Sequence, residues 1–205
     1  MKMVHRYLYV AGTFVWAVCL CVNSYAAANR STSMNQSGSG SPEMQQFKAQ
    51  QQQKIQEYLD QLNRNGKIFM QSLAGKSKDQ ILEELKVFKT EQYYKNSAFR
   101  QQMHEEQKAF ISKRFDENPN ANTAMKDRML NRIDQDFEDL KAFHAGKHEE
   151  NMEFIDRLAA DESMQGEKLM STIQDFFKSQ KADAKAFLQQ QQSRYKRGQQ
   201  NGFGQ

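Results

Sequence analysis

The stretch from residue 104 to residue 155 carries one short pattern twice: HEEQKAFI at 104–111 and HEENMEFI at 148–155. The two copies are offset by 44 residues, which is four units of 11. Eleven residues make about three turns of an α-helix, so residues at this spacing return to nearly the same helix face. Asn118-Pro119-Asn120 separates the copies, and such a proline segment ends a helix. The stretch therefore predicts two long helices joined by a reversal.

Aromatic residues extend the 11-residue spacing beyond this stretch. Four series occur: Phe47, Tyr58 and Phe69; Phe88, Phe99 and Phe110; Phe143 and Phe154; Phe176 and Phe187. A fixed internal spacing of this kind indicates a repeat. If the helices run antiparallel, Phe88 lies level with Phe154 and Phe99 with Phe143, each about a midpoint at Ala121. We expect two aromatic layers, Tyr58/Phe88/Phe154/Phe176 and Phe47/Phe99/Phe143/Phe187.

Helix start and stop signals divide the rest of the chain. Ser41-Pro42-Glu43 is typical of a helix start, and Ser77-Lys78-Asp79-Gln80 is a capping box that opens a helix reaching about Glu117. Asn65-Gly66 predicts a stop, followed by a short segment over 67–74 that Gly75 ends. Two further helices are expected, over about 123–160 and 164–197, with a weak break at 161–166.

The fold class that follows is all-α, an elongated antiparallel helical bundle of about four long helices with no sheet. Five of the six valines lie in the first 22 residues, and Val87 is the only one beyond them. So few β-branched residues disfavour a sheet. Gly146 lies inside the third long helix, where glycine lowers helix stability by about 1 kcal/mol relative to alanine.

The first 28 residues have the pattern of a secretory signal peptide. A short basic start precedes an apolar run over residues 7–22, and small residues then offer cleavage after Ala26 or Ala28. We therefore expect an exported protein, periplasmic in a Gram-negative bacterium and secreted otherwise. A flexible linker is expected at 29–41, the helical bundle domain at 42–197 and a flexible tail at 198–205.

Composition excludes several function classes. Both cysteines, Cys19 and Cys21, lie in the signal segment, which leaves no disulfide, cysteine-ligated metal, attached haem or cysteine nucleophile in the mature chain. Loss of Lys2 and Arg6 lowers the net charge from +4 to +2, without the basic patch that nucleic acid binding requires. Catalytic motifs are also missing. The sequence predicts no enzyme activity and no cofactor.

The aromatic stripes are expected to serve mainly as core, since an apolar stripe at helical spacing packs inward. Polar residues interrupt them, however, and Phe and Met on long polar helices can form an adaptable surface for other chains. The candidate binding residues are Phe99, Met103, Phe110, Phe115, Phe137 and Phe143.

Three functions are weighed on this basis. The favoured hypothesis is an extracytoplasmic chaperone-like or scaffold protein, alone or as a homo-oligomer, whose partners are other polypeptides such as unfolded or envelope proteins. The first alternative is a lipid or membrane-surface binding protein built on the 11-residue amphipathic repeats. The second is a metal-binding bundle using His144 and His148, which share a helix face at four-residue spacing. His104 is expected to lie level with Glu138, away from that histidine pair.

Overall fold

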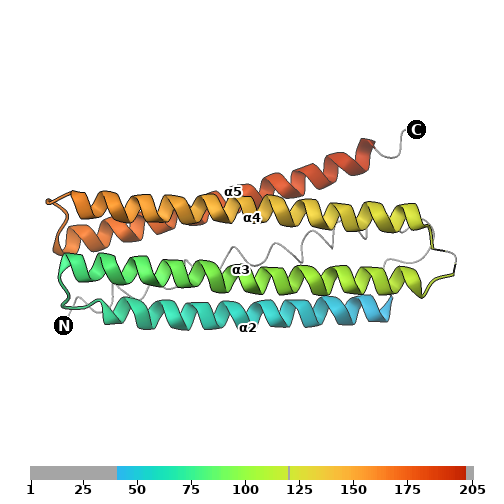
Figure 1. Cartoon of the computed structure of the whole chain (residues 1–205), viewed down its shortest axis with the longest axis horizontal. Helices are drawn as coiled ribbons and strands as arrows, with labels where there is room; N and C mark the ends of the chain where they lie inside the picture. The colour runs from blue at the N-terminus through green and yellow to red at the C-terminus, as the bar shows by residue number, and fades with distance from the viewer. Residues whose placement is uncertain (1–40, 120, 202–205) are drawn as a thin grey trace. The chain divides into compact units, whose positions relative to one another are not determined.

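The computed structural model describes residues 41–119 and 121–201, and these residues form four long helices without a strand. They are α2 (Pro42–Ser72), α3 (Lys78–Asp116), α4 (Thr123–Ala160) and α5 (Gly166–Asn201) (Figure 1). The all-α class is confirmed. The signal segment, residues 29–40 of the linker and residues 202–205 lie outside the described residues. No helix within the described ranges has the length and apolar character to span a bilayer.

The chain divides into two compact units. One is the continuous segment Ser77–Met164, which holds α3 and α4. The other combines the chain segments on either side of it and holds α2 and α5. The predicted aromatic pairs within the first unit can be compared with the structure, whereas the pairs that join α2 or α5 to it stay predictions.

Short polar side chains begin three of the helices, as the sequence predicts for two of them. Ser77 Oγ accepts a hydrogen bond from the Gln80 backbone N–H at 3.4 Å, and Gln80 Oε1 accepts one from the Ser77 N–H at 3.0 Å, which completes the capping box. Ser41 caps α2, and Asn122 Oδ1 caps α4 at 3.1 Å from the Met125 nitrogen. These bonds satisfy N–H groups that have no partner within the helix.

Two predicted helix ends are wrong. Helix α2 continues through Asn65 and Gly66 to Ser72, because an Asn-Gly pair ends a helix only when the glycine takes the left-handed conformation. That conformation occurs at Gly75, with φ of 77°, and Gly66 stays helical and buried. Helix α5 runs four residues beyond the expected end at Arg197, to Asn201, so part of the predicted tail is helical.

The register of the α3–α4 hairpin is confirmed. Four of the side-chain pairs that cross between the helices have their midpoint at residue 121: Lys86–Asp156, Thr90–Met152, Lys108–Asp134 and Asp116–Lys126. Figure 1 shows α4 returning alongside α3 from the loop that contains Pro119. This register places Phe88 level with Phe154, and Phe99 level with Phe143, as predicted.

A lysine closes the open end of the hairpin. Lys78, the first residue of α3, donates hydrogen bonds from Nζ to the carbonyl oxygens of Ala159 at 2.9 Å and Asp161 at 2.8 Å. The last carbonyls of a helix lack partners within the helix and carry partial negative charge, so a lysine is favourable there. The start of α3 and the end of α4 are thereby tied together.

Replacement of Gly146 by alanine should raise the free energy of unfolding by about 1 kcal/mol. Gly146 lies within α4, and an added Cβ would meet nothing within 4 Å. Gly75→Ala is the matched control: its surroundings are equally open, but its positive φ should make alanine destabilising by about 1–2 kcal/mol. Urea unfolding of both variants tests this, and a Gly146→Ala protein no more stable than wild type would contradict it.

Candidate functional site

The middle of α3 is buried and polar. Five polar side chains of this helix are buried: Lys89, Gln92, Arg100, His104 and Gln107. Apolar residues such as Leu85 and Ile111 are buried nearer its ends. Burial lowers the pKa of Lys89 well below its ordinary value of 10.5, and the amide nitrogen of Gln92 is buried without a hydrogen-bond partner. Because burying polar groups costs free energy unless they are bonded, this region stabilises the fold less than an apolar core would.

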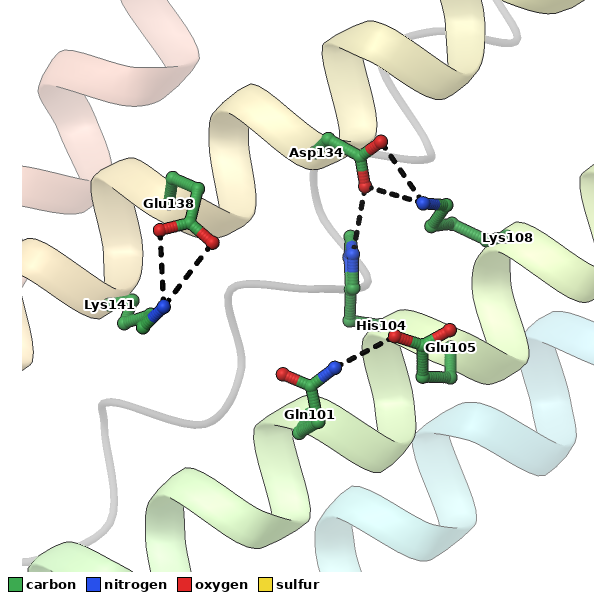
Figure 2. Close-up of polar contacts among 7 residues, drawn as sticks. All are labelled: Gln101, His104, Glu105, Lys108, Asp134, Glu138 and Lys141. Carbon is green, nitrogen blue, oxygen red and sulfur yellow. Dashed lines mark hydrogen bonds and ion pairs between the residues drawn. The ribbon is translucent and has the colours of Figure 1, made fainter.

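His104 is the best-connected of these polar residues (Figure 2). It reaches from α3 towards α4, where its Nε2 lies 3.0 Å from Asp134 Oδ1. Lys108 Nζ contacts the same carboxylate, 2.8 Å from Oδ1 and 3.0 Å from Oδ2. The imidazole also stacks on Phe137 of α4, with ring centroids 4.1 Å apart and 14° between the planes. One carboxylate therefore joins two side chains of α3, and an aromatic ring covers the imidazole.

Burial is the main influence on the charge of His104. Its side chain is 7% exposed, and this desolvation lowers its pKa from 6.5. Asp134 acts in the opposite direction and raises the pKa, whereas Lys108 lowers it. His104 is therefore neutral near pH 7, with the Nε2 proton donated to Asp134.

The same stack occurs a second time in the hairpin. His148 of α4 stacks on Tyr93 of α3, with centroids 4.3 Å apart and 9° between the planes. Adding the repeat offset of 44 to Tyr93 and His104 leads to Phe137 and His148, so the second stack is the first with the two helices exchanged. The α3–α4 hairpin thus has approximate two-fold symmetry about its middle.

The neighbours of the two stacks differ in charge. At the position equivalent to the Asp134–Lys108 pair, Thr90 Oγ1 lies 3.9 Å from Met152 Sδ. His148 therefore has no carboxylate equivalent to Asp134, and its Nδ1 is buried without a hydrogen-bond partner. Desolvation lowers its pKa from 6.5, and the charge of Glu149 acts in the opposite direction with a smaller effect. The two stacks therefore share one ring geometry, but an ion pair lies beside His104 whereas uncharged groups lie beside His148.

The structure places most of the predicted binding residues at intermediate exposure. Phe99, Phe110 and Phe115 on α3, and Phe137 and Phe143 on α4, are half-buried. Met103 is 1% exposed and belongs to the core. Phe137 lies against His104, while Phe143 contacts the edge of His144 at 5.4 Å and has Lys147 Nζ 5.8 Å from its centroid. The candidates therefore line the hairpin rather than meet at one point.

The predicted histidine pair does not gain further ligands. Within the described ranges, no group of three or more His, Cys, Asp or Glu side chains is placed to hold a metal ion. His144 packs against Phe143, and His148 stacks on Tyr93. A stable protein zinc site needs three or four converging ligands, so the structure offers these histidines aromatic contacts in place of metal coordination.

An Asp–His pair can support general base catalysis when the imidazole reaches a reacting group. In this structure His104 contacts Asp134 through Nε2 and stacks on Phe137, so the cluster links α3 to α4. The sequence analysis missed Asp134 and Tyr93. The register about residue 121 places His104 level with Glu138, as predicted, but Glu138 pairs with Lys141 of its own helix at 3.3 Å (Figure 2). The 44-residue offset relates Tyr93 to Phe137 and so could have indicated that these two aromatic positions are equivalent.

Asp134→Asn should lower the pKa of His104 further, because it removes the carboxylate that favours the protonated ring. Glu138→Gln is the control, since Glu138 is paired with Lys141 and does not contact His104. Titration of the histidine C2 protons by NMR, with His104→Gln for assignment, measures both shifts. An unchanged His104 pKa in Asp134→Asn would show that the contact is not formed.

Comparison with known proteins returns no match: no family model, curated protein or solved structure resembles the chain. A function must therefore be inferred from the residues and their geometry. The features available are buried polar residues on α3, half-buried aromatic side chains and two histidine stacks.

Proposed function

We propose that this chain is an exported, non-enzymatic binding protein that engages other polypeptides through the Phe- and Met-bearing faces of its helices, in a chaperone-like or scaffold role. The observation that carries the proposal is the half-burial of the aromatic residues along α3 and α4, together with the polar residues in the buried stripe of α3. Part of the apolar surface of each half-buried ring is exposed to solvent, and a partner could cover that part.

The buried polar residues of α3 support this role energetically. Burial of apolar area contributes about 25 cal/mol per Å², and α3 gives part of its buried surface to Lys89, Gln92 and Gln107 instead. Local opening around α3 therefore costs less free energy, because fewer apolar contacts are broken. A partner that offers apolar side chains can replace the contacts of the half-buried rings, and flexible residues such as Met adapt to varied shapes.

Exposed apolar side chains offer a first point of contact. Val87 is 50% exposed and Tyr94 is 65% exposed. They lie seven residues apart on α3, which is about two turns and hence the same side of the helix. Polar residues surround them, including the Glu91–Lys95 ion pair. Two isolated side chains suit weak, reversible contact with extended chains better than a permanent interface.

Phe110→Ala should weaken the suppression of client aggregation while lowering the melting temperature only modestly, because Phe110 is half-buried. Phe154→Ala is a matched control, since Phe154 holds the equivalent position in the second repeat and is only 8% exposed. Its loss should cost about 3–5 kcal/mol of unfolding free energy, as for a core phenylalanine. Thermal melts and an aggregation assay with a reduced, unfolding client protein measure both effects.

The opposite pattern would contradict the proposal. If Phe110→Ala lost as much stability as Phe154→Ala and still suppressed aggregation at the wild-type rate, Phe110 would be core and not a binding residue. Flotation with phosphatidylglycerol vesicles separates the lipid-binding alternative: a protein that floats with the vesicles and leaves client aggregation unchanged is a membrane-surface protein.

A further inference from the structure

The two histidine stacks suggest a response to pH that is independent of any binding partner. Each ring lies between the two helices of the hairpin and is stacked on an aromatic ring of the opposite helix. Stacking and burial suit a neutral imidazole, whose transfer away from water costs far less than that of an imidazolium ion. Both stacked imidazoles therefore link α3 to α4, and at both positions the neutral form of the ring is favoured.

Protonation has different consequences at the two positions. At His104, the added charge meets the carboxylate of Asp134, which already contacts Nε2 at 3.0 Å. Lys108 shares this carboxylate, and its side chain is one-third exposed, so it can turn to solvent and leave Asp134 to His104. The ion pair thus compensates part of the cost of a charged His104.

His148 lacks this compensation. Protonation would place a hydrogen on Nδ1, which is buried and has no acceptor. Across the hairpin, α3 presents the neutral phenol of Tyr93 and the hydroxyl of Thr90. The charged residues beside them, Glu91 and Lys95, are exposed and pair with each other at 3.0 Å. On α4 itself, His144 lies one turn before His148 on the same face. Glu149 is exposed and favours the charged ring, but by less than burial disfavours it.

We propose that the α3–α4 hairpin is an acid-sensitive latch, held closed by two neutral stacked imidazoles and released when His148 takes up a proton that no carboxylate across the hairpin can balance. The repeat provides a comparison within the same chain, because His104 has the same stacked geometry as His148 but also contacts the carboxylate of Asp134. Release means local separation of α3 and α4 around Tyr93 and His148.

The direction of the pH dependence follows from proton linkage. Burial lowers the pKa of His148 in the folded chain below the value near 6.5 expected when unfolded. The unfolded chain therefore binds more protons at His148 as the solution is acidified, so the contribution of neutral His148 to stability is complete above about pH 6.5 and falls as the pH drops towards the folded pKa. Lys89, whose pKa is also lowered by burial, adds a separate pH dependence that is common to wild type and the His148 variants. His104 contributes in the same direction, because its pKa is also lowered.

Thr90→Asp is the decisive variant, since it installs a carboxylate at the position equivalent to Asp134. It should raise the pKa of His148 and reduce the loss of stability between about pH 7.5 and pH 5. Thr90→Asn is the matched control, having the same shape without the charge, and should leave the pKa unchanged. NMR titration of the His148 C2 proton in the full chain, together with urea midpoints at both pH values, measures these effects.

His148→Gln supplies an independent test should Thr90→Asp fail to fold. It removes the titrating group, so its urea midpoint should change less between the two pH values than that of wild type. The proposal is overturned if His148 of the wild-type chain titrates at or above pH 6.5. It is also overturned if His148→Gln loses as much stability on acidification as wild type does.

Discussion

The antiparallel register of α3 and α4 is the constraint on which the other features depend. These helices have 39 and 38 residues and are joined by a loop too short to allow much choice of pairing. Asp116–Lys126 fixes the register at the loop, and Lys86–Asp156 continues it towards the open end. Single exposed ion pairs contribute little. Their agreement about residue 121 shows instead that the packing of the whole hairpin follows one register, which determines which aromatic ring each histidine meets.

A second constraint is that long helices expose much of their surface and bury only a narrow stripe of side chains. In α3, polar residues such as Lys89 and Gln92 occupy part of that buried stripe. The consequence is that local opening around α3 costs less free energy than it would with an apolar stripe of equal length. The proposed binding role and the proposed acid response both draw on this property, because each needs α3 and α4 to separate locally at modest cost.

The 44-residue duplication explains why the hairpin carries two similar clusters with different chemistry. Exchange of α3 and α4 superimposes the His104–Phe137 stack on the His148–Tyr93 stack. Packing preserves the rings at both positions, while the neighbouring pair is Asp134–Lys108 in one cluster and Thr90–Met152 in the other. A change at these two neighbouring positions alters the electrostatics of the stacked histidine without altering the helix pairing, because the contacts that set the register lie along the whole hairpin.

The amino-acid sequence by itself determined the helical class, the limits of α3 and α4 and the register between them. These depend on local signals, namely the Ser77 capping box, the Pro119 loop and the 11-residue aromatic spacing, whose effects extend over only a few turns. The tertiary structure alone decided that His104 meets Asp134 and Phe137 while Glu138 pairs with Lys141. Register sets the level of a residue along the helix axis, whereas its partner also depends on the rotation of the helix about that axis and on side-chain length. The continuation of α2 through Gly66 was likewise beyond the sequence pattern, because an Asn-Gly pair is compatible with both a stop and a helix, and the surrounding packing selects between them.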